Sequence, residues 1–169
     1  MVALQKIGNF LWIYVICGVL LSGFIYQWST GEDPCVLCFL ERLGMIGIAI
    51  GILMNMRFGI RPEHYGIAII ASVVGRVTSL RQIALHICPQ FPAFGTPVFG
   101  FDLYVWAFIV FNCSVIAASV LLLMYGLGKR EKIAPFWNLG AKIAFWLVVS
   151  ITAINCVMIL RVCGLSACA

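Results

Sequence analysis

An acidic loop and a long apolar run meet at Pro34-Cys35-Val36-Leu37-Cys38-Phe39-Leu40-Glu41-Arg42. Two residues separate the two cysteines, a spacing that lets a small disulfide ring close and reopen, or that supplies half of a metal site. The apolar run that follows is long enough to cross a membrane as a helix. The chemistry of the motif therefore depends on which side of a membrane it faces, and the rest of the chain predicts that side.

The composition is that of a membrane protein. Hydrophobic residues make up 63% of the chain and charged residues 10%, whereas soluble domains carry about 25% charged residues. The net charge of +5 does not indicate a nucleic-acid-binding protein. The cations instead form short clusters between apolar runs, which is the pattern that membrane topology produces.

Five apolar runs are long enough to span a bilayer, and polar connections that contain glycine or proline separate them. The first run is longer than the apolar region of a signal peptide, so we expect a retained helix, with a cleaved signal as the alternative. We predict an all-α membrane protein with a single membrane domain over residues 1–169. The expected spans are about 8–28, 38–56, 64–87, 101–127 and 141–160.

The charges predict which side of the membrane each connection faces. If five spans alternate in direction, the acidic residues Glu32, Asp33 and Asp102 lie on the side opposite the basic clusters. The positive-inside rule then puts the N-terminus in the cytoplasm. With only four spans, the C-terminal tail would be cytoplasmic instead. The residues on the basic side are Lys6, Arg57, Arg61, Lys129, Arg130 and Lys132.

The eight cysteines fall into two groups. Cys17, Cys113 and Cys156 lie inside apolar runs, where cysteine serves as a small apolar side chain. The others lie at the ends of runs and, in this topology, at the outer, oxidising face. These five are Cys35, Cys38, Cys88, Cys163 and Cys168.

Cys38 and Arg42 form the first candidate site. If the second helix begins near Cys35, Cys38 lies in its first turn, where the helix dipole favours a thiolate. Arg42 is one turn deeper on the same face, about 6 Å away, and can stabilise a thiolate or the oxyanion of a ligand. The alternatives are a static disulfide with Arg42 extending to the interface, or half a zinc site, although no second ligand pair has finger-like spacing.

Further candidates lie in the third span. Arg81 is expected at about the depth of Arg42, and two arginines at one depth suit an electron-rich molecule with an apolar body, such as a quinone. His86 could hydrogen-bond a carbonyl or exchange protons, or it could simply face water. Glu41 is expected to be a salt-bridge partner rather than an acid catalyst, and Arg76 receives no role.

The motif around Cys35 and Cys38 resembles that of the disulfide bond formation protein B (DsbB) family of bacterial inner-membrane quinone reductases, and the segment Arg81–Pro89 resembles that family's third helix. The resemblance implies a four-helix bundle, to which this chain adds a fifth helix. It also implies oxidation of a periplasmic thioredoxin-fold dithiol oxidase (DsbA-like), with electrons passing to ubiquinone or menaquinone. By the same resemblance, Cys38 would contact the quinone, Cys35 would exchange with a second cysteine pair, and Arg42 would bind the quinone.

The second cysteine pair is where the chain departs from the family. The family often carries this pair between the third and fourth spans, but here that loop has only Cys88. The usual histidine also sits a few residues later than His86. We hypothesise that Cys163 and Cys168 form the shuttle disulfide, or that one of them pairs with Cys88. The alternative is that the tail cysteines are incidental.

The sequence therefore predicts an inner-membrane thiol:quinone oxidoreductase with its redox cysteines in the periplasm. One alternative is a vitamin K epoxide reductase-like enzyme, whose cysteine motif would be expected late in the bundle. Another is a small transport or assembly subunit with structural disulfides. Transporters usually show internal repeats or broken helices, and the sequence shows no repeat.

Overall fold

The computed structural model describes residues 2–31, 35–87, 97–128 and 134–164. These residues form five helices, each long and apolar enough to cross a membrane, which confirms the predicted all-α membrane architecture. The predicted spans begin and end within a few residues of the helices in four cases, and α1 begins earlier than predicted. The helices are α1 (Val2–Thr30), α2 (Val36–Phe58), α3 (Pro62–Ile87), α4 (Leu103–Leu127) and α5 (Leu139–Cys163).

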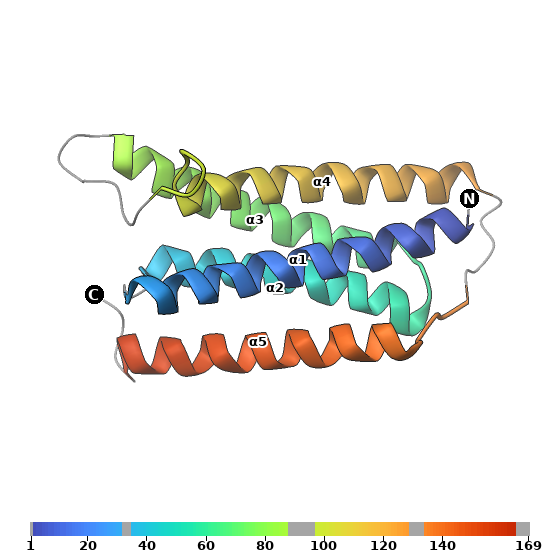
Figure 1. The fold of residues 1–169 in the computed structure, drawn as a ribbon. Helices are drawn as coiled ribbons and strands as arrows, with labels where there is room; N and C mark the ends of the chain where they lie inside the picture. Colours follow the sequence, from blue (N-terminus) through green and yellow to red (C-terminus); the bar gives the residue numbers. More distant parts are fainter. Residues whose placement is uncertain (1, 32–34, 88–96, 129–133, 165–169) are drawn as a thin grey trace.

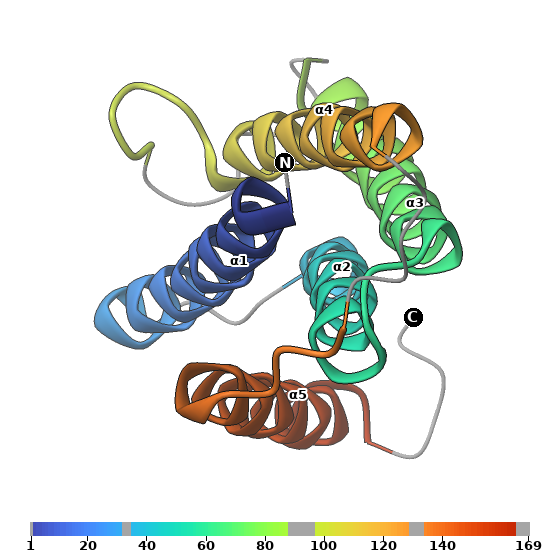
Figure 2. The same ribbon diagram turned by 90° about the vertical axis from the view of Figure 1, so that its right-hand side faces the viewer.

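Consecutive helices run in opposite directions, so α1 begins at one end of the bundle and α5 finishes at the other (Figure 1). We call these the Lys6 end and the Cys35 end. Viewed along the bundle, α2 lies at the centre (Figure 2). It contacts each of the other four helices, whereas α5 packs only against α1 and α2. The fifth helix is thus an addition to a bundle formed by α1–α4.

Small residues let α2, α3 and α4 approach closely. A Cβ atom added to Gly75 of α3 would lie 2.2 Å from the ring of Phe111, which projects from α4. Such contacts are typical of membrane helices, whose association depends on close packing rather than on exclusion of water. The small residues at the contact between α2 and α3 are Gly44, Gly47, Gly51, Ala68, Ala71 and Gly75.

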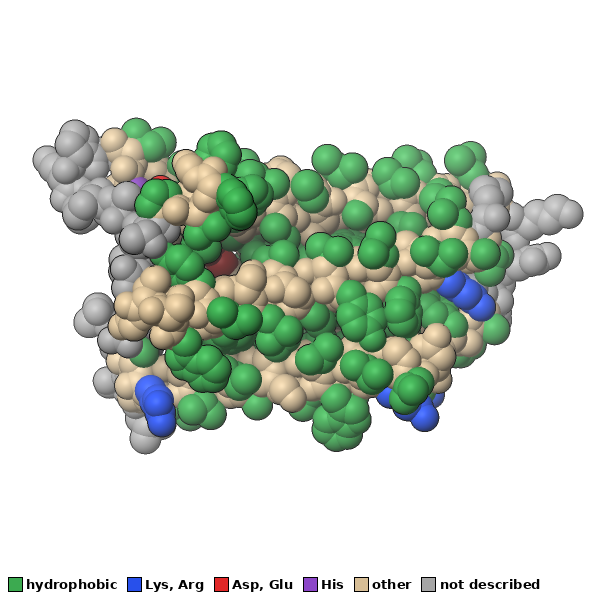
Figure 3. All heavy atoms as spheres, viewed as in Figure 1, with side chains coloured by type: hydrophobic (Ala, Val, Ile, Leu, Met, Phe, Trp, Pro, Cys, Tyr) green, Lys and Arg blue, Asp and Glu red, His purple; other side chains and the backbone are tan. Residues whose placement is uncertain are grey.

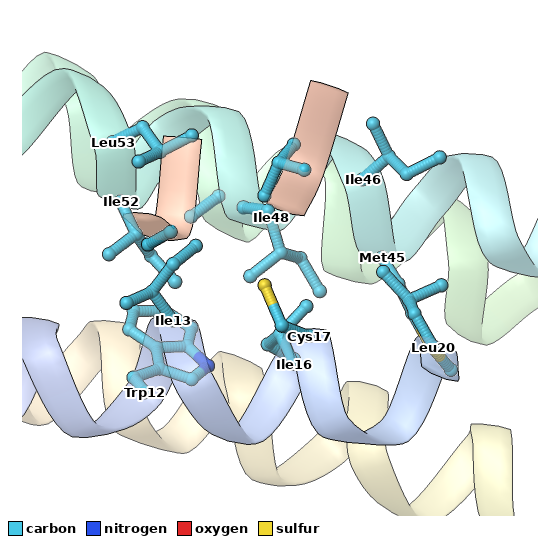
Figure 4. Close-up of a cluster of buried hydrophobic side chains, with 14 of the residues drawn as sticks. Trp12, Ile13, Ile16, Cys17, Leu20, Met45, Ile46, Ile48, Ile52 and Leu53 are labelled. Atoms are coloured by element: carbon cyan, nitrogen blue, oxygen red, sulfur yellow. The ribbon is translucent and has the colours of Figure 1, made fainter. Parts of the chain in front are cut away.

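An apolar core fills the space between α1 and α2 (Figure 4). Cys17 belongs to this core and is 2% exposed, in keeping with its predicted packing role. Cys113 and Cys156 instead lie on exposed helix faces. The labelled core residues are Trp12, Ile13, Ile16, Cys17, Leu20, Met45, Ile46, Ile48, Ile52 and Leu53.

A buried polar cluster joins three helices at the Lys6 end. Asn55 of α2 donates from Nδ2 to Oδ1 of Asn9 on α1 over 3.1 Å. Asn9 in turn donates to the hydroxyl of Tyr65 on α3 over 2.6 Å. Oδ1 of Asn55 lies 3.1 Å from Nδ1 of His64. Hydrogen bonds between membrane helices contribute about 0.6 kcal/mol each on average, so the cluster helps to fix the register of α1, α2 and α3.

The segment before α5 is attached to the same end of the bundle. The backbone N–H of Phe136 donates to the carbonyl of Met56 over 3.0 Å. The guanidinium of Arg57 lies 5.5 Å from the ring centroid of Trp137. Asn138 caps α5 through a 2.9 Å bond from the N–H of Ala141. These contacts fix the start of α5 beside the end of α2.

Candidate active site

Cys35 is the N-cap residue of α2, as its position after the acidic loop predicts. Its backbone is extended, with φ −71° and ψ 159°, and its sulfur accepts a 3.2 Å hydrogen bond from the N–H of Cys38. Cys38 lies in the first turn of the helix, where unpaired N–H groups and the helix dipole favour negative charge. Both cysteines are free thiols in this structure.

The Cys35 sulfur ionises more readily than an ordinary thiol. A hydrogen bond from the Cys38 side chain is the main cause, and it lowers the pKa of Cys35 to about 7 against the opposing effect of burial. The thiolate form of Cys35 is therefore well populated near neutral pH. When Cys35 is ionised, the Cys38 thiol donates a hydrogen bond to its sulfur, and Cys35 is the nucleophile ready for disulfide exchange.

Gln82 connects the cysteine pair to α3. Its Nε2 atom lies 3.4 Å from Sγ of Cys35 and 3.7 Å from Sγ of Cys38. Gln82 is 1% exposed, and its Oε1 atom has no hydrogen-bond partner among the described residues. No role for Gln82 was predicted from the sequence. The signal that could have identified it is a polar side chain in an apolar span near the depth of the cysteines.

Arg42 is held in place by α1. Its Nη2 atom donates a 2.8 Å hydrogen bond to Oε1 of Gln27, and its guanidinium lies 4.3 Å from the ring centroid of Phe24. Its Nη1 atom is buried and has no partner within the described part of the chain. One edge of the guanidinium is thus fixed, and the other can bind a ligand. Neither Gln27 nor Phe24 was singled out from the sequence.

A cavity of about 410 Å³ lies beside this site, lined by residues of α1–α4 and of the segment before α4. The space-filling view shows a hollow between α1 and α4 with acidic atoms inside it (Figure 3). Most of the lining is apolar, and the polar side chains include Cys38, Glu41, Arg42 and Gln82. The last three each have a buried polar atom without a hydrogen-bond partner among the described residues. Buried polar atoms are normally paired, so this wall has the character of a ligand-binding site.

Arg81 and His86 do not line this cavity. Arg81 is exposed, because adjacent helix residues point about 100° apart and Gln82 faces inward. His86 is half-buried and stacks on Tyr104, a cavity residue, at a centroid distance of 5.0 Å. Its Nδ1 atom lies 2.7 Å from the carbonyl of Gln82, so Nδ1 carries the hydrogen and donates to that oxygen. The structure thus brings Gln82, rather than Arg81, next to the cysteines.

Glu41 forms no ion pair within the described residues, although a salt bridge was expected. Its carboxyl group is 6% exposed and hydrogen-bonds Ser79 on α3. Cys88 and Cys168 lie outside the described residues. Cys163 is the last residue of α5, which finishes at the Cys35 end of the bundle (Figure 1).

Fold and site together define a multi-pass α-helical membrane protein with a dithiol at a helix N-terminus beside a largely apolar cavity. A family model described as "Disulfide bond formation protein DsbB" matches residues 5–161. The chain belongs to this family. It is therefore a multi-pass inner-membrane protein of disulfide bond formation.

Individual relatives agree with this assignment at low identity, and each is named disulfide bond formation protein B. The relative from Haemophilus influenzae (strain 86-028NP) is 23% identical over 66% of this chain and 82% of its own length. The one from Aromatoleum aromaticum is 26% identical, covering 86% of this chain and 85% of the relative. The one from Marinobacter nauticus is 32% identical over 51% and 55%, respectively. No solved structure matches the chain.

Proposed function

We propose that the protein is a thiol:quinone oxidoreductase that reoxidises a periplasmic DsbA-like dithiol oxidase and passes the electrons to ubiquinone or menaquinone. The observation that carries this proposal is the position of Cys38 in the wall of an apolar cavity. Arg42 and Gln82 line the same cavity, and Nη1 of Arg42 and Oε1 of Gln82 have no hydrogen-bond partner among the described residues. A dithiol beside such a cavity can transfer electrons to a ligand that enters from the lipid.

The residues present fit a quinone. A quinone has a flat apolar ring and two carbonyl oxygens, and the cavity offers an apolar lining with a buried donor on Arg42. Gln82 Oε1 is an acceptor that suits the hydroxyl group of the reduced ring. When bound, the quinone supplies the two-electron oxidant, while the protein supplies position and electrostatics.

The two cysteines have separate tasks in this proposal. Cys38 lines the cavity and Cys35 does not, so Cys38 is the sulfur that faces the quinone. Cys35, at the helix terminus and with a pKa near neutrality, exchanges with the second cysteine pair through a mixed disulfide. Arg42 and Gln82 stabilise negative charge on Cys38 and on the ligand oxygen it faces.

For the second pair we propose Cys163 with Cys168, or one of these with Cys88. The course of α5 supports this, because the helix finishes at the same end of the bundle as Cys35 (Figure 1). That end faces the periplasm in this proposal, since Lys6, Arg57 and Arg61 lie at the opposite end. Replacing both Cys163 and Cys168 with serine is expected to abolish oxidation of the partner while quinone reduction by added dithiothreitol continues. Wild-type turnover with the partner in this double variant would exclude the tail pair.

The test of the proposed function is direct. Purified protein is mixed with a reduced DsbA-like oxidase and either a short-chain ubiquinone or a short-chain menaquinone, and loss of the quinone absorbance is followed. Turnover is expected in the wild type and is expected to be lost in Cys38→Ser, with Cys113→Ser as the control cysteine. If neither quinone is reduced by the wild type, or if Cys38→Ser is fully active, the proposal is wrong.

A further inference from the structure

We propose that Glu41 is the internal proton donor of the cavity: its carboxyl group gives a proton to the quinone during reduction and recovers it from water at the Cys35 end. This inference rests on the proposed function, and no role of this kind follows from the cysteine motif itself. It follows from three features of the structure, which are the burial of Glu41, its hydrogen bond to Ser79 and the groups that share its cavity.

Burial without an ion pair is the first feature. Glu41 is 6% exposed, makes no ion pair within the described residues, and has an Oε1 atom with no hydrogen-bond partner there. An unpaired carboxylate inside a membrane protein is costly and normally marks a functional site. Arg42 is the next residue in the chain, but its guanidinium is bonded to Gln27 instead. The surroundings of Glu41 therefore suit a carboxyl group that holds a proton.

The hydroxyl of Ser79 on α3 is a hydrogen-bond partner of the Glu41 carboxyl group. A serine hydroxyl has one hydrogen, and that of Ser79 is donated to the carbonyl of Gly75 over 3.1 Å. After Glu41 has lost its proton, Ser79 can turn its hydrogen toward the carboxylate. Ser79 can thus stabilise the carboxylate that remains after Glu41 has given up its proton.

Arg42 and Tyr104, which also line the cavity, are less suited to this task. Arg42 retains its proton at all relevant pH values. The hydroxyl of Tyr104 is donated to Asp102 over 2.6 Å. Ser79 and Gln82, which face Glu41 from α3, are not titratable. The titratable or charged groups around Glu41 are Cys35, Cys38 and Arg42 at the start of α2, Tyr26 on α1 and Tyr104 on α4.

The proton count of the reaction calls for such a donor. Formation of the Cys35–Cys38 bond releases two electrons, and conversion of the quinone to the hydroquinone consumes two electrons and two protons. Above about pH 7 the reduced pair mainly carries one proton, on Cys38, because the pKa of Cys35 is about 7. Glu41 supplies the second proton. The Glu41 carboxylate then takes up a proton from water. Reduction of the Cys35–Cys38 bond by the partner dithiol releases one proton to water, so the protons balance over the full cycle.

The test compares Glu41→Gln with Glu63→Gln, an exposed glutamate in the first turn of α3 that serves as the matched control. General acid catalysis contributes about 10²–10⁴-fold, so we expect single-turnover reduction of a short-chain ubiquinone to be at least about tenfold slower in E41Q. The rate in E41Q should also rise more steeply as the pH falls, because water becomes the proton source. E63Q should match the wild type, and Glu41→Asp should recover part of the rate.

An infrared difference spectrum of quinone reduction gives a readout independent of the rate. The wild type and E63Q should show a change in the C=O stretch of a protonated carboxyl group, E41D should shift that band and E41Q should lack it. The inference is overturned if the wild type shows no such band, or if E41Q reduces ubiquinone at the wild-type rate at every pH. A wild type that reduces neither ubiquinone nor menaquinone would refute the proposed function instead. If E41Q does not fold, the band in wild type and E41D decides the question.

Discussion

Replacing Gln27 with leucine is expected to weaken quinone binding through Arg42. Gln27 is 8% exposed, and its Oε1 atom accepts a 2.8 Å hydrogen bond from Nη2 of Arg42. A hydrogen bond to a charged group contributes about 1.5–3 kcal/mol. The guanidinium would keep its contact with Phe24, at 4.3 Å from the ring centroid, and such a contact contributes about 0.5–2 kcal/mol. The variant therefore loses one of two restraints on Arg42.

The size of the effect follows from these energies. Since about 1.4 kcal/mol corresponds to a factor of ten, complete loss of the hydrogen bond would cost about 10- to 100-fold in kcat/KM for quinone. Because the contact with Phe24 remains, we expect the lower limit, about tenfold. Most of the effect should be in KM, since Gln27 orients a group that binds the quinone before and during reduction.

The assay is steady-state reduction of a short-chain ubiquinone at saturating dithiol, with Gln27→Glu as the control. Glutamate keeps an acceptor oxygen at the same distance along the side chain, so Q27E should stay close to the wild-type KM. Alkylation of Cys35 should be unchanged in both variants, because Gln82 rather than Gln27 contacts the sulfurs. A Q27L protein with wild-type kcat and KM would refute the reasoning that Gln27 positions Arg42.

Two further predictions concern the sulfur pair and the contact between α3 and α4. In Cys38→Ala, Cys35 loses the side-chain hydrogen bond that does most to lower its pKa to about 7. The reactive thiolate forms above the pKa, so the midpoint pH for labelling of Cys35 by iodoacetamide should move upward. Labelling at pH 7 should slow by roughly tenfold. An unchanged midpoint pH would contradict this prediction. Gly75→Ala introduces a Cβ 2.2 Å from the Phe111 ring and should destabilise the protein by about 1–3 kcal/mol. The control is Gly66→Ala, whose Cβ meets open space, so this variant should have neutral or slightly raised stability. Equal melting temperatures of these two variants in detergent would count against the packing argument.

The helices could be predicted from the sequence, but their packing faces could not. Hydropathy is a local property, so five apolar runs gave five helices with ends close to the predicted ones. In a membrane, however, the lipid-facing and buried sides of a helix are both apolar, and no amphipathic pattern marks the inner face. This is why Arg81 was expected to face Arg42, when α3 in fact turns Gln82 inward. The central position of α2 was equally invisible to a reading of hydropathy.

The residues of the candidate site likewise fall into two groups, those brought together by one helix and those brought together by tertiary packing. Cys35, Cys38, Glu41 and Arg42 lie within one turn or two of each other on α2, and their proximity follows from helix geometry alone. Gln27 and Gln82 reach the same place from α1 and α3, and their contribution depends on tertiary packing. The signal that sequence reasoning passed over was the occurrence of amides in apolar spans, where polar side chains usually have a partner.

The position of α2 explains how these side chains meet at one site. A helix at the centre of the bundle can be contacted from all sides, so the end that carries Cys35 and Cys38 receives Gln27 from α1, Gln82 from α3 and Tyr104 from α4. Burial of the Arg42 guanidinium is costly and requires compensation. Gln27 hydrogen-bonds one edge of the guanidinium and the Phe24 ring covers one face, which leaves Nη1 without a partner in the part of the chain that the structure describes. A ligand with an acceptor oxygen at Nη1 completes the set, so the cavity should prefer ligands that carry a carbonyl over hydrocarbon of the same shape.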